Sequence, residues 1–417
     1  MAIHAPEIAA ADRVRSGPKP VLELCERLEC AGIAAYVQGE ALLDTWLGTQ
    51  RERAPSRALV CLAEPSRVLA TLPTAVVTAD SARRLTQATA AGPVDLIPVG
   101  ELPIESALAS FGLAPLALAL RPADGRWCDP GDVRERLEKR QFGLLANRPN
   151  PFRLAPRRFW IAAQLIAEYA LEPQPELVQA AREALPDVVD RLPEGAPARR
   201  VLERILASPF PARALGFLRE TGVSPAVLPG LEAAAEARVE ALETVHSVRW
   251  AVFLRGGSTA RALARLRMPQ ALARRISRVQ EAHPLDRTIE GARDVQIRRA
   301  MGRLTDEELD GLIAWRRAEL ASERSGSESQ LQGERLTRIE TAIARVRDQA
   351  SESHSLRALA LDGGDVMRLL GSGPGRHVGG ALAHLARIVA DHPERNERAA
   401  LEAELHAWQT GQSSPAI

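Results

Sequence analysis

The stretch Leu359–Leu385, LALDGGDVMRLLGSGPGRHVGGALAHL, indicates how the C-terminal half of this 417-residue chain is built. An Asp-Gly-Gly-Asp turn precedes a short apolar run, a Gly-Pro-Gly sequence interrupts it, and a new helical pattern begins at Arg376. Glycine and proline end helices, whereas a short side chain such as that of Asp362 can cap the first turn of a helix. The pattern therefore predicts two short helices separated by a tight break.

The spacing of apolar residues divides the remaining chain near Asn147. Before this residue, five short apolar runs have strand length: IAAYVQG, RALVCLA, TAVVTA, PVDLIPVG and PLALALRP. After it, apolar residues recur at helical spacing, with breaks at proline and glycine. The predicted fold class is α+β, with a small mixed α/β head followed by an elongated all-helical neck, body and tail. The expected segments are a flexible leader (1–20), head (21–146), neck (147–235), Arg-rich body (236–320), linker or exposed loop (321–335) and helical tail (336–417).

The net charge of +1 conceals a strong local imbalance in the body. Thirteen arginines and four acids lie between His246 and Arg303. Guanidinium groups bind phosphates well because their planar fork donates two hydrogen bonds at once. A solvated helix face in an Arg-rich protein is the competing interpretation. The RNA-binding candidates are Arg265, Arg267, Arg274, Arg275, Arg278 and Arg376.

Cysteine and histidine patterns exclude several other kinds of site. The four cysteines form no CxxC pair, and the eight histidines show no HxH or HExxH spacing, so no zinc site is predicted. No stretch approaches about 20 uninterrupted apolar residues, which a membrane-spanning helix requires. The sequence therefore predicts a soluble cytoplasmic protein that binds neither membrane nor DNA.

Four segments together with the tail resemble the class II tRNA nucleotidyltransferase and poly(A) polymerase family, which includes the CCA-adding enzymes. The segments are AGIAAYVQGEALLDTWLG (31–48), LASFGLAPLAL (108–118), DGRWCDPGDVRERLEKRQF (124–142) and PNPFR (149–153). The resemblance implies that Gly39, Asp129 and Arg153 are remnants of a nucleotide-binding site. It also implies that the tail with Arg376 contacts RNA.

The catalytic part of the family pattern is largely missing. Two strand aspartates one residue apart would point to one face and hold two Mg²⁺ ions, but the matching segment SRALVCLAEP contains no aspartate. The second glycine of the phosphate-binding turn is Glu40, and the acidic partner of Arg153 is Asn150. Only Asp44 and Asp95 are left as catalytic candidates.

These departures predict a catalytically degenerate, RNA-binding homologue that needs no cofactor. One alternative is an active CCA-adding or poly(A)-adding enzyme that uses Mg²⁺ and a non-standard carboxylate pair, Asp95 with Glu64 or Asp44. A second alternative is a helical scaffold for protein interactions. The sequence predicts tRNA-like RNA as the partner and leaves the oligomeric state open.

Overall fold

In the computed structural model the chain forms two compact units. Unit 1 comprises Met1–Glu236 with Gly256–Arg267, and unit 2 comprises Ala237–Arg255 with Met268–Ile417. The structure describes residues 19–49, 57–78, 81–231, 235–242, 246–289, 293–322, 327–353 and 359–410. The leader expected at 1–20 lies outside the described residues, apart from the last two, which open helix α2.

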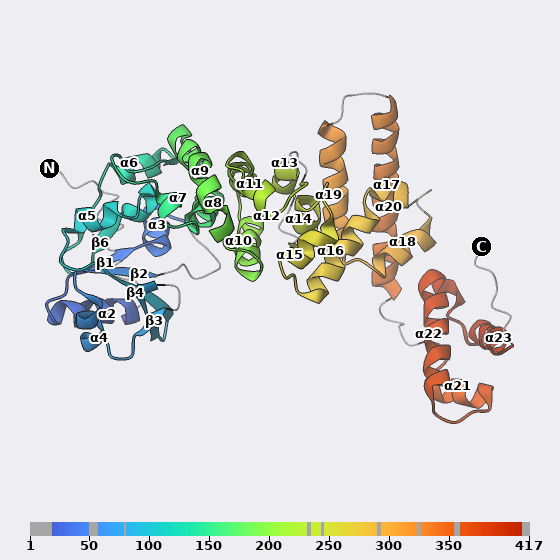
Figure 1. The fold of residues 1–417 in the computed structure, drawn as a ribbon. Helices are drawn as coiled ribbons and strands as arrows, with labels where there is room; N and C mark the ends of the chain where they lie inside the picture. The colour runs from blue at the N-terminus through green and yellow to red at the C-terminus, as the bar shows by residue number, and fades with distance from the viewer. Residues whose placement is uncertain are drawn as a thin grey trace. The chain divides into compact units, whose positions relative to one another are not determined.

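Unit 1 contains a seven-stranded sheet with the strand order β3-β4-β5-β2-β1-β6-β7 (Figure 1). Its strands are β1 (Ala35–Gln38), β2 (Ala58–Cys61), β3 (Val76–Thr78), β4 (Ser81–Thr89), β5 (Gly92–Pro98), β6 (Ala119–Arg121) and β7 (Arg126–Cys128). Strands β2 and β5 run parallel, whereas the other neighbouring strands run antiparallel. This mixed sheet confirms the predicted α/β head, and five of its strands coincide with the five apolar runs.

Short helices cover the sheet and connect its strands. They are α2 (Lys19–Cys30), α3 (Glu40–Leu47), α4 (Pro65–Thr71), α5 (Ile104–Ala109), η1 (Ala114–Ala117) and α6 (Val133–Glu138). In α2 the buried residues Val21, Leu24, Cys25 and Leu28 recur every three or four positions. This spacing places them on one face, and α2 packs that face against β1 and α4. The head core is therefore apolar and lies between the helices and the sheet.

The rest of unit 1 is helical, as predicted for the neck. Its helices are α7 (Pro151–Leu154), α8 (Arg158–Tyr169), α9 (Pro175–Val188), η2 (Val189–Arg191), α10 (Ala196–Ala207), α11 (Pro211–Glu220), α12 (Val223–Val227) and α15 (Thr259–Arg265). Helix α8 is buried along most of its length and packs against α10 and α11. A short parallel pair, β8 (Gln141–Phe142) and β9 (Glu172–Pro173), adds one strand after residue 147.

Among the described residues of unit 2, every element of secondary structure is a helix. Its helices are the C-terminal part of α13 (Ala235–Glu240), then α14 (His246–Phe253), α16 (Gln270–Ala282), α17 (Leu285–Thr288), α18 (Asp294–Met301), α19 (Asp306–Ser322), α20 (Ser327–Ser353), α21 (Gly363–Leu370), α22 (Arg376–Asp391), η5 (Pro393–Arg395) and α23 (Arg398–Gln409). The segment expected as a linker or exposed loop at 321–335 is helical from Ser327 onward. The polar composition of this segment predicted a loop. In the structure Gln332 is buried against Arg316 of α19, and buried apolar residues follow from Leu336.

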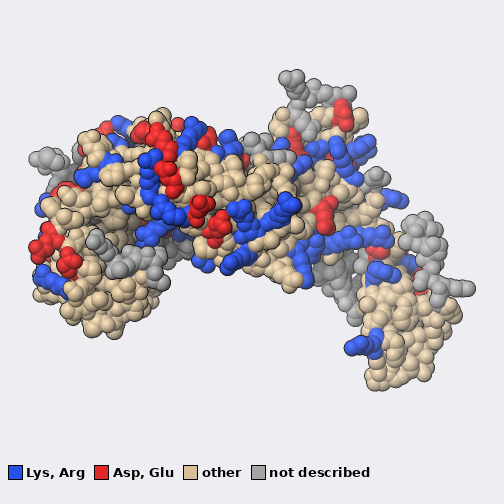
Figure 2. All heavy atoms as spheres, in the orientation of Figure 1, with Lys and Arg blue, Asp and Glu red and all other residues tan. Residues whose placement is uncertain are grey.

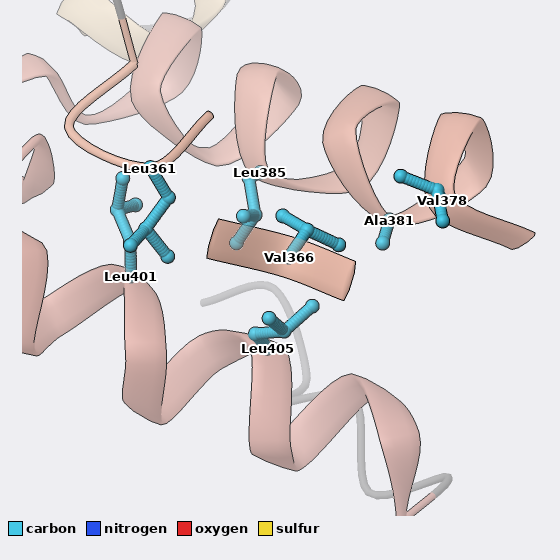
Figure 3. Packing of buried hydrophobic residues seen from close by; sticks show 7 residues of the cluster. All are labelled: Leu361, Val366, Val378, Ala381, Leu385, Leu401 and Leu405. Atoms are coloured by element: carbon cyan, nitrogen blue, oxygen red, sulfur yellow. The ribbon is translucent and has the colours of Figure 1, made fainter. Parts of the chain in front are cut away.

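The tail has a small apolar core of its own (Figure 3). Side chains from α21, α22, α23 and the segment just before α21 meet there, namely Leu361, Val366, Val378, Ala381, Leu385, Leu401 and Leu405. Asp362 and Asp365 form a capping box at the start of α21, and Gly371 ends that helix with a φ of 62°. The two helices predicted from this stretch are therefore observed, and the break places Arg376 at the first turn of α22.

Candidate functional site

Four strands of the head bring one row of residues into register on the same face of the sheet. Gln38 of β1 pairs with Ala58 of β2, Ala58 pairs with Asp95 of β5, and Asp95 pairs with Thr86 of β4. The next residue of β2 on this face is Val60, because side chains alternate along a strand. A second metal-binding carboxylate would have to lie on β2 beside Asp95. The two β2 residues on this face, Ala58 and Val60, are both apolar.

The carboxylate of Asp95 is bound by two residues of β4. Its carboxylate forms an ion pair with Arg84 and accepts a hydrogen bond from Thr86 Oγ1 at 3.1 Å. The side chain remains 29% exposed. A carboxylate neutralised by a neighbouring guanidinium is a poor ligand for a cation, because the cation would have to displace the arginine.

Glu64 lies beyond the C-terminal end of β5, whereas Asp95 lies in the middle of this strand. A Cβ atom added to Gly100 would come within 2.8 Å of Glu64 Oε1, so the Glu64 carboxylate lies beside Gly100. Pro98, the last residue of β5, is three residues and roughly 10 Å from Asp95 at about 3.3 Å per residue, and Gly100 follows beyond Pro98. Since Mg²⁺ binds oxygens at about 2 Å, Glu64 and Asp95 are too far apart to hold one ion.

The phosphate-turn position is occupied by a polar contact within the protein. Gly39 adopts a φ of 88°, which glycine permits, and Glu40 begins helix α3. The Glu40 side chain is buried and its Oε1 accepts hydrogen bonds from Gln164 Nε2 at 2.8 Å and Arg204 Nη2 at 2.9 Å. Arg204 also donates to Glu168 Oε1 at 2.6 Å. The negative charge of Glu40 is therefore directed into the neck.

Asp44, the other catalytic candidate, also contacts the neck. The Tyr169 hydroxyl donates to Asp44 Oδ1 at 2.8 Å and lies 3.1 Å from the backbone oxygen of Glu40. Within the described ranges, no three histidine, cysteine or acidic side chains gather closely enough to hold a metal ion. Asp44 and Asp95 each have partners of their own within the protein.

Asp129 stabilises the loop that precedes α6. Its carboxylate accepts hydrogen bonds from the backbone nitrogen of Val133 at 2.6 Å and from Arg134 Nε at 2.8 Å. The Arg134 guanidinium in turn lies 5.6 Å from the ring centre of Trp46 and 5.5 Å from that of Trp127. These contacts fix the loop, which the family resemblance assigns to the nucleotide site.

Arg153 finds an acidic partner in a different helix from the one expected. Its Nε forms an ion pair with Asp187 Oδ2 of α9 at 3.1 Å, and its side chain is 54% exposed. Asn150 caps α7 by accepting a hydrogen bond from Phe152 N at 3.0 Å. Its amide nitrogen donates to the Ala180 oxygen at 2.7 Å. Both residues therefore join α7 to α9.

Sequence reasoning missed Arg158, which links two of the motif segments. Its guanidinium donates to the Pro151 oxygen at 3.1 Å and to the Ser110 oxygen at 3.4 Å. Burial, aided by the nearby charge of Arg157, lowers the pKa of Arg158 to about 10. No carboxylate pairs with it among the residues that the structure covers. The only sequence signal was its place beside the basic segment after PNPFR.

Comparisons with known proteins agree on one group of relatives. The A-adding tRNA nucleotidyltransferase of Deinococcus radiodurans is 28% identical over 325 residues, which cover 66% of this chain and 72% of that protein. The solved CCA-adding enzyme of Bacillus stearothermophilus in complex with CTP aligns at a TM-score of 0.65 and 20% identity, covering 98% of this chain and 99% of that one. The Thermotoga maritima CCA-adding enzyme complexed with tRNA aligns at 0.65 and 16% identity, covering 93% and 94%. The sequence matches no family model.

These relatives confirm the resemblance to the class II tRNA nucleotidyltransferase family. In this chain, the arginines predicted to bind RNA fall in both units. Arg265 and Arg267 belong to unit 1, where Arg265 forms an ion pair with Glu194 at 2.9 Å. Arg267 lies beside Gly195.

The other body arginines lie on α16 of unit 2. Arg275 forms an ion pair with the buried Glu308 at 2.9 Å. Arg274 and Arg278 are exposed, and Arg278 donates to the backbone oxygens of Arg274 and Arg303. Figure 2 shows basic side chains over the α16 and α18 part of this unit. Arg274 and Arg278 are thus presented to solvent, whereas Arg275 has a structural partner.

Arg376, the tail arginine, is exposed. Arg376 lies at the start of α22, next to His377, whose Nε2 is 2.9 Å from Ser372 Oγ. This contact ties the Gly-Pro-Gly turn to the helix. Across the described part of the chain, no helix is both long and apolar enough to cross a membrane.

A charged cluster inside unit 2 was not predicted. Glu319 of α19, only 6% exposed, contacts His283 and several arginines. Burial would raise the pKa of Glu319, but His283, Arg255 and Arg238 lower it to about 2. Burial also holds the pKa of His283 below its usual range. The residues come from helices distant in sequence, so no local pattern could indicate the cluster.

Proposed function

We propose that this protein binds tRNA-like RNA and does not add nucleotides to it efficiently. The observation that carries the proposal is the row of the sheet in which Ala58, not a carboxylate, lies in register with Asp95. Two metal ions supply several kcal/mol of charge stabilisation in nucleotide transfer, so a site without paired carboxylates loses orders of magnitude in rate.

The internal partners of the remaining acids support the same conclusion. Asp95 forms an ion pair with Arg84. Asp44 accepts a hydrogen bond from the Tyr169 hydroxyl, and Glu40 accepts one from Arg204. Binding a metal or a triphosphate there would require breaking these contacts. The polar residues of the former site instead join the head to the neck.

Binding of RNA is supported by the family and by the exposed arginines. The relatives include an A-adding tRNA nucleotidyltransferase and a CCA-adding enzyme complexed with tRNA. Arg274 and Arg278 are exposed on α16, and no side-chain carboxylate pairs with either among the described residues. Double-stranded RNA is recognised mainly by shape and backbone, so such a surface needs no base contacts.

The salt dependence of tRNA binding tests this part of the proposal. We would measure the affinity for labelled tRNA at several salt concentrations, for the wild type and for the double variant R274A/R278A. Each phosphate contact adds about 0.7–0.9 to the slope of log affinity against log salt, so the double variant should lose about 1.4–1.8. Arg275 is left in place because its removal would deprive the buried Glu308 carboxylate of an ion-pair partner.

A matched control removes the same charge elsewhere in unit 2. The variant R335A/R338A changes two exposed arginines of α20 that have no side-chain carboxylate partner in the described ranges. We expect it to bind tRNA with the slope of the wild type. Failure of the wild type to bind at low salt, or equal loss in both double variants, would contradict the proposal for this surface. Binding of protein partners that is insensitive to salt would favour the scaffold alternative.

A further inference from the structure

Two arginines of helix α18 meet the end of the tail helix α22, which packs against α18. The guanidinium group of Arg299 binds the side chain of Asp391, with Nη2 3.0 Å and Nε 3.3 Å from Oδ2. The neighbouring Arg298 donates from Nη1 to the backbone oxygen of Asp391 at 2.9 Å. Successive arginines of α18 therefore converge on one negatively charged helix end.

The position of Asp391 in its own helix is unfavourable. Asp391 is the last residue of α22, and the last turn of this helix contains no basic residue. The unpaired carbonyl groups give the C-terminal end of a helix a partial negative charge, which repels a carboxylate. The carboxylate of Asp391 is therefore stabilised by the arginine of α18 and not by the helix that carries it.

The two partners of this ion pair differ in their exposure to solvent. The side chain of Asp391 is only 15% exposed, whereas that of Arg299 is 55% exposed. The edge of a guanidinium group that carries Nε and Nη2 can bind a phosphate through two parallel hydrogen bonds. In Arg299 this edge is occupied by Asp391. The carboxylate thus takes the place that a phosphate would use.

The ion pair lies close to the surface for which RNA binding is proposed above. Helix α18 ends at Met301, and the backbone oxygen of Arg303, two residues further on, accepts a hydrogen bond from Arg278 of α16 at 3.2 Å. Arg299 precedes Arg303 by four residues, which is about one helical turn. Arg299 is therefore near enough to Arg278 to contact the same RNA backbone.

The tail does not need Asp391 for its own folding. Its apolar core is formed by residues of α21, α22, α23 and the segment before α21, and Asp391 is not one of them. A change of Asp391 should therefore remove the ion pair with α18 and leave the core of the tail intact.

We propose that Asp391 masks Arg299, and that loss of this contact adds Arg299 to the surface that binds RNA phosphates. The contact is autoinhibitory, because it keeps an exposed arginine of α18 from the phosphates while the tail stays in place. This inference rests on the proposed RNA binding by Arg274 and Arg278, and it adds a regulation of that surface by the tail.

Salt-dependent binding of labelled tRNA to the full chain tests the masking. In D391A the slope of log affinity against log salt should steepen by about 0.7–0.9, the value of one additional phosphate contact. D391N, which keeps the shape of the side chain, should steepen the slope in the same direction. R299A should keep the slope of the wild type, because Arg299 is masked there. The double variant D391A/R299A should return to the slope of the wild type.

The matched control is E397A, which removes one exposed acid of the tail. The Glu397 side chain has no arginine partner among the residues that the structure describes. E397A should therefore keep the slope of the wild type, although it removes the same charge as D391A.

Three outcomes would overturn the masking: an unchanged slope in D391A, a steeper slope that persists in D391A/R299A, or a slope that already falls in R299A. The variant R274A/R278A keeps this test separate from that of the proposed function. A wild type that binds tRNA and loses slope in R274A/R278A, with no change of slope in D391A, would leave the RNA-binding surface in place and reject the masking alone.

Discussion

Replacing Glu40 with alanine should destabilise unit 1, because the Glu40 carboxylate joins the head to the neck. Glu40 is 7% exposed, and its Oε1 accepts one hydrogen bond from Gln164 and one from Arg204. Hydrogen bonds to charged groups contribute about 1.5–3 kcal/mol each. Arg204 keeps Glu168 as a partner at 2.6 Å, so its charge is not left alone. We therefore expect a loss of about 2–4 kcal/mol in the free energy of unfolding of unit 1.

Urea unfolding of the wild type, E40A, R204M and the double variant measures this interaction as a double-mutant cycle. The expected coupling between Glu40 and Arg204 is about 1.5–3 kcal/mol, since the pair is largely shielded from water. E101A is the matched control, because Glu101 is exposed on the same head and should change stability by less than about 0.5 kcal/mol. Effects of E40A and R204M that simply add within about 0.5 kcal/mol would refute the contact as described.

Three further predictions concern unit 2. The pKa of Glu319 is about 2 in the folded state, against an ordinary value of 4.5. The stabilisation of the folded state by the ionised Glu319 carboxylate is therefore complete above pH 4.5. It should be lost as pH falls toward 2, by roughly 3 kcal/mol, and E319Q should flatten that part of the pH profile in urea unfolding. R275A should cost about 1–3 kcal/mol because it leaves a buried carboxylate short of a partner, whereas R274A should stay within about 0.5 kcal/mol. G311A should lower the melting temperature, at a cost of about 1–3 kcal/mol, because its Cβ would lie 2.9 Å from a side-chain carbon of α14. G333A has open space and should be neutral or stabilising by up to about 1 kcal/mol.

The period of the apolar residues was sufficient to predict the change from a sheet-containing head to a helical remainder. It was not sufficient for β4, whose sequence SARRLTQAT shows no alternation of apolar and polar residues. The polar side chains Arg84 and Thr86 fit this strand because they bind Asp95 on the neighbouring strand. Such a cross-strand partner becomes visible only when the strands are paired. The same reason explains why β7 was not predicted: it is a short strand at the edge of the sheet, where its neighbour among the described strands is β6.

The missing carboxylates of the head could be read directly from the sequence, whereas the new roles of the remaining residues could not. Glu40 and Arg204 are 164 residues apart, and Asp44 and Tyr169 are 125 residues apart. No local pattern links such pairs. The Arg-rich stretch was recognised as basic, but the sequence could not separate Arg275, which holds a buried acid, from its exposed neighbour Arg274. Contacts between distant helices decide that difference.

Incorporation of labelled CTP or ATP into tRNA lacking its 3′ end tests the central claim most directly. Purified protein would be incubated with Mg²⁺, with and without a chelator, beside a CCA-adding enzyme as the positive control. Loss of several kcal/mol of metal-ion stabilisation corresponds to a rate lower by at least about a thousandfold. We predict incorporation at or below that level and no response to the chelator, while tRNA still binds. Robust incorporation that depends on Mg²⁺ would contradict the account.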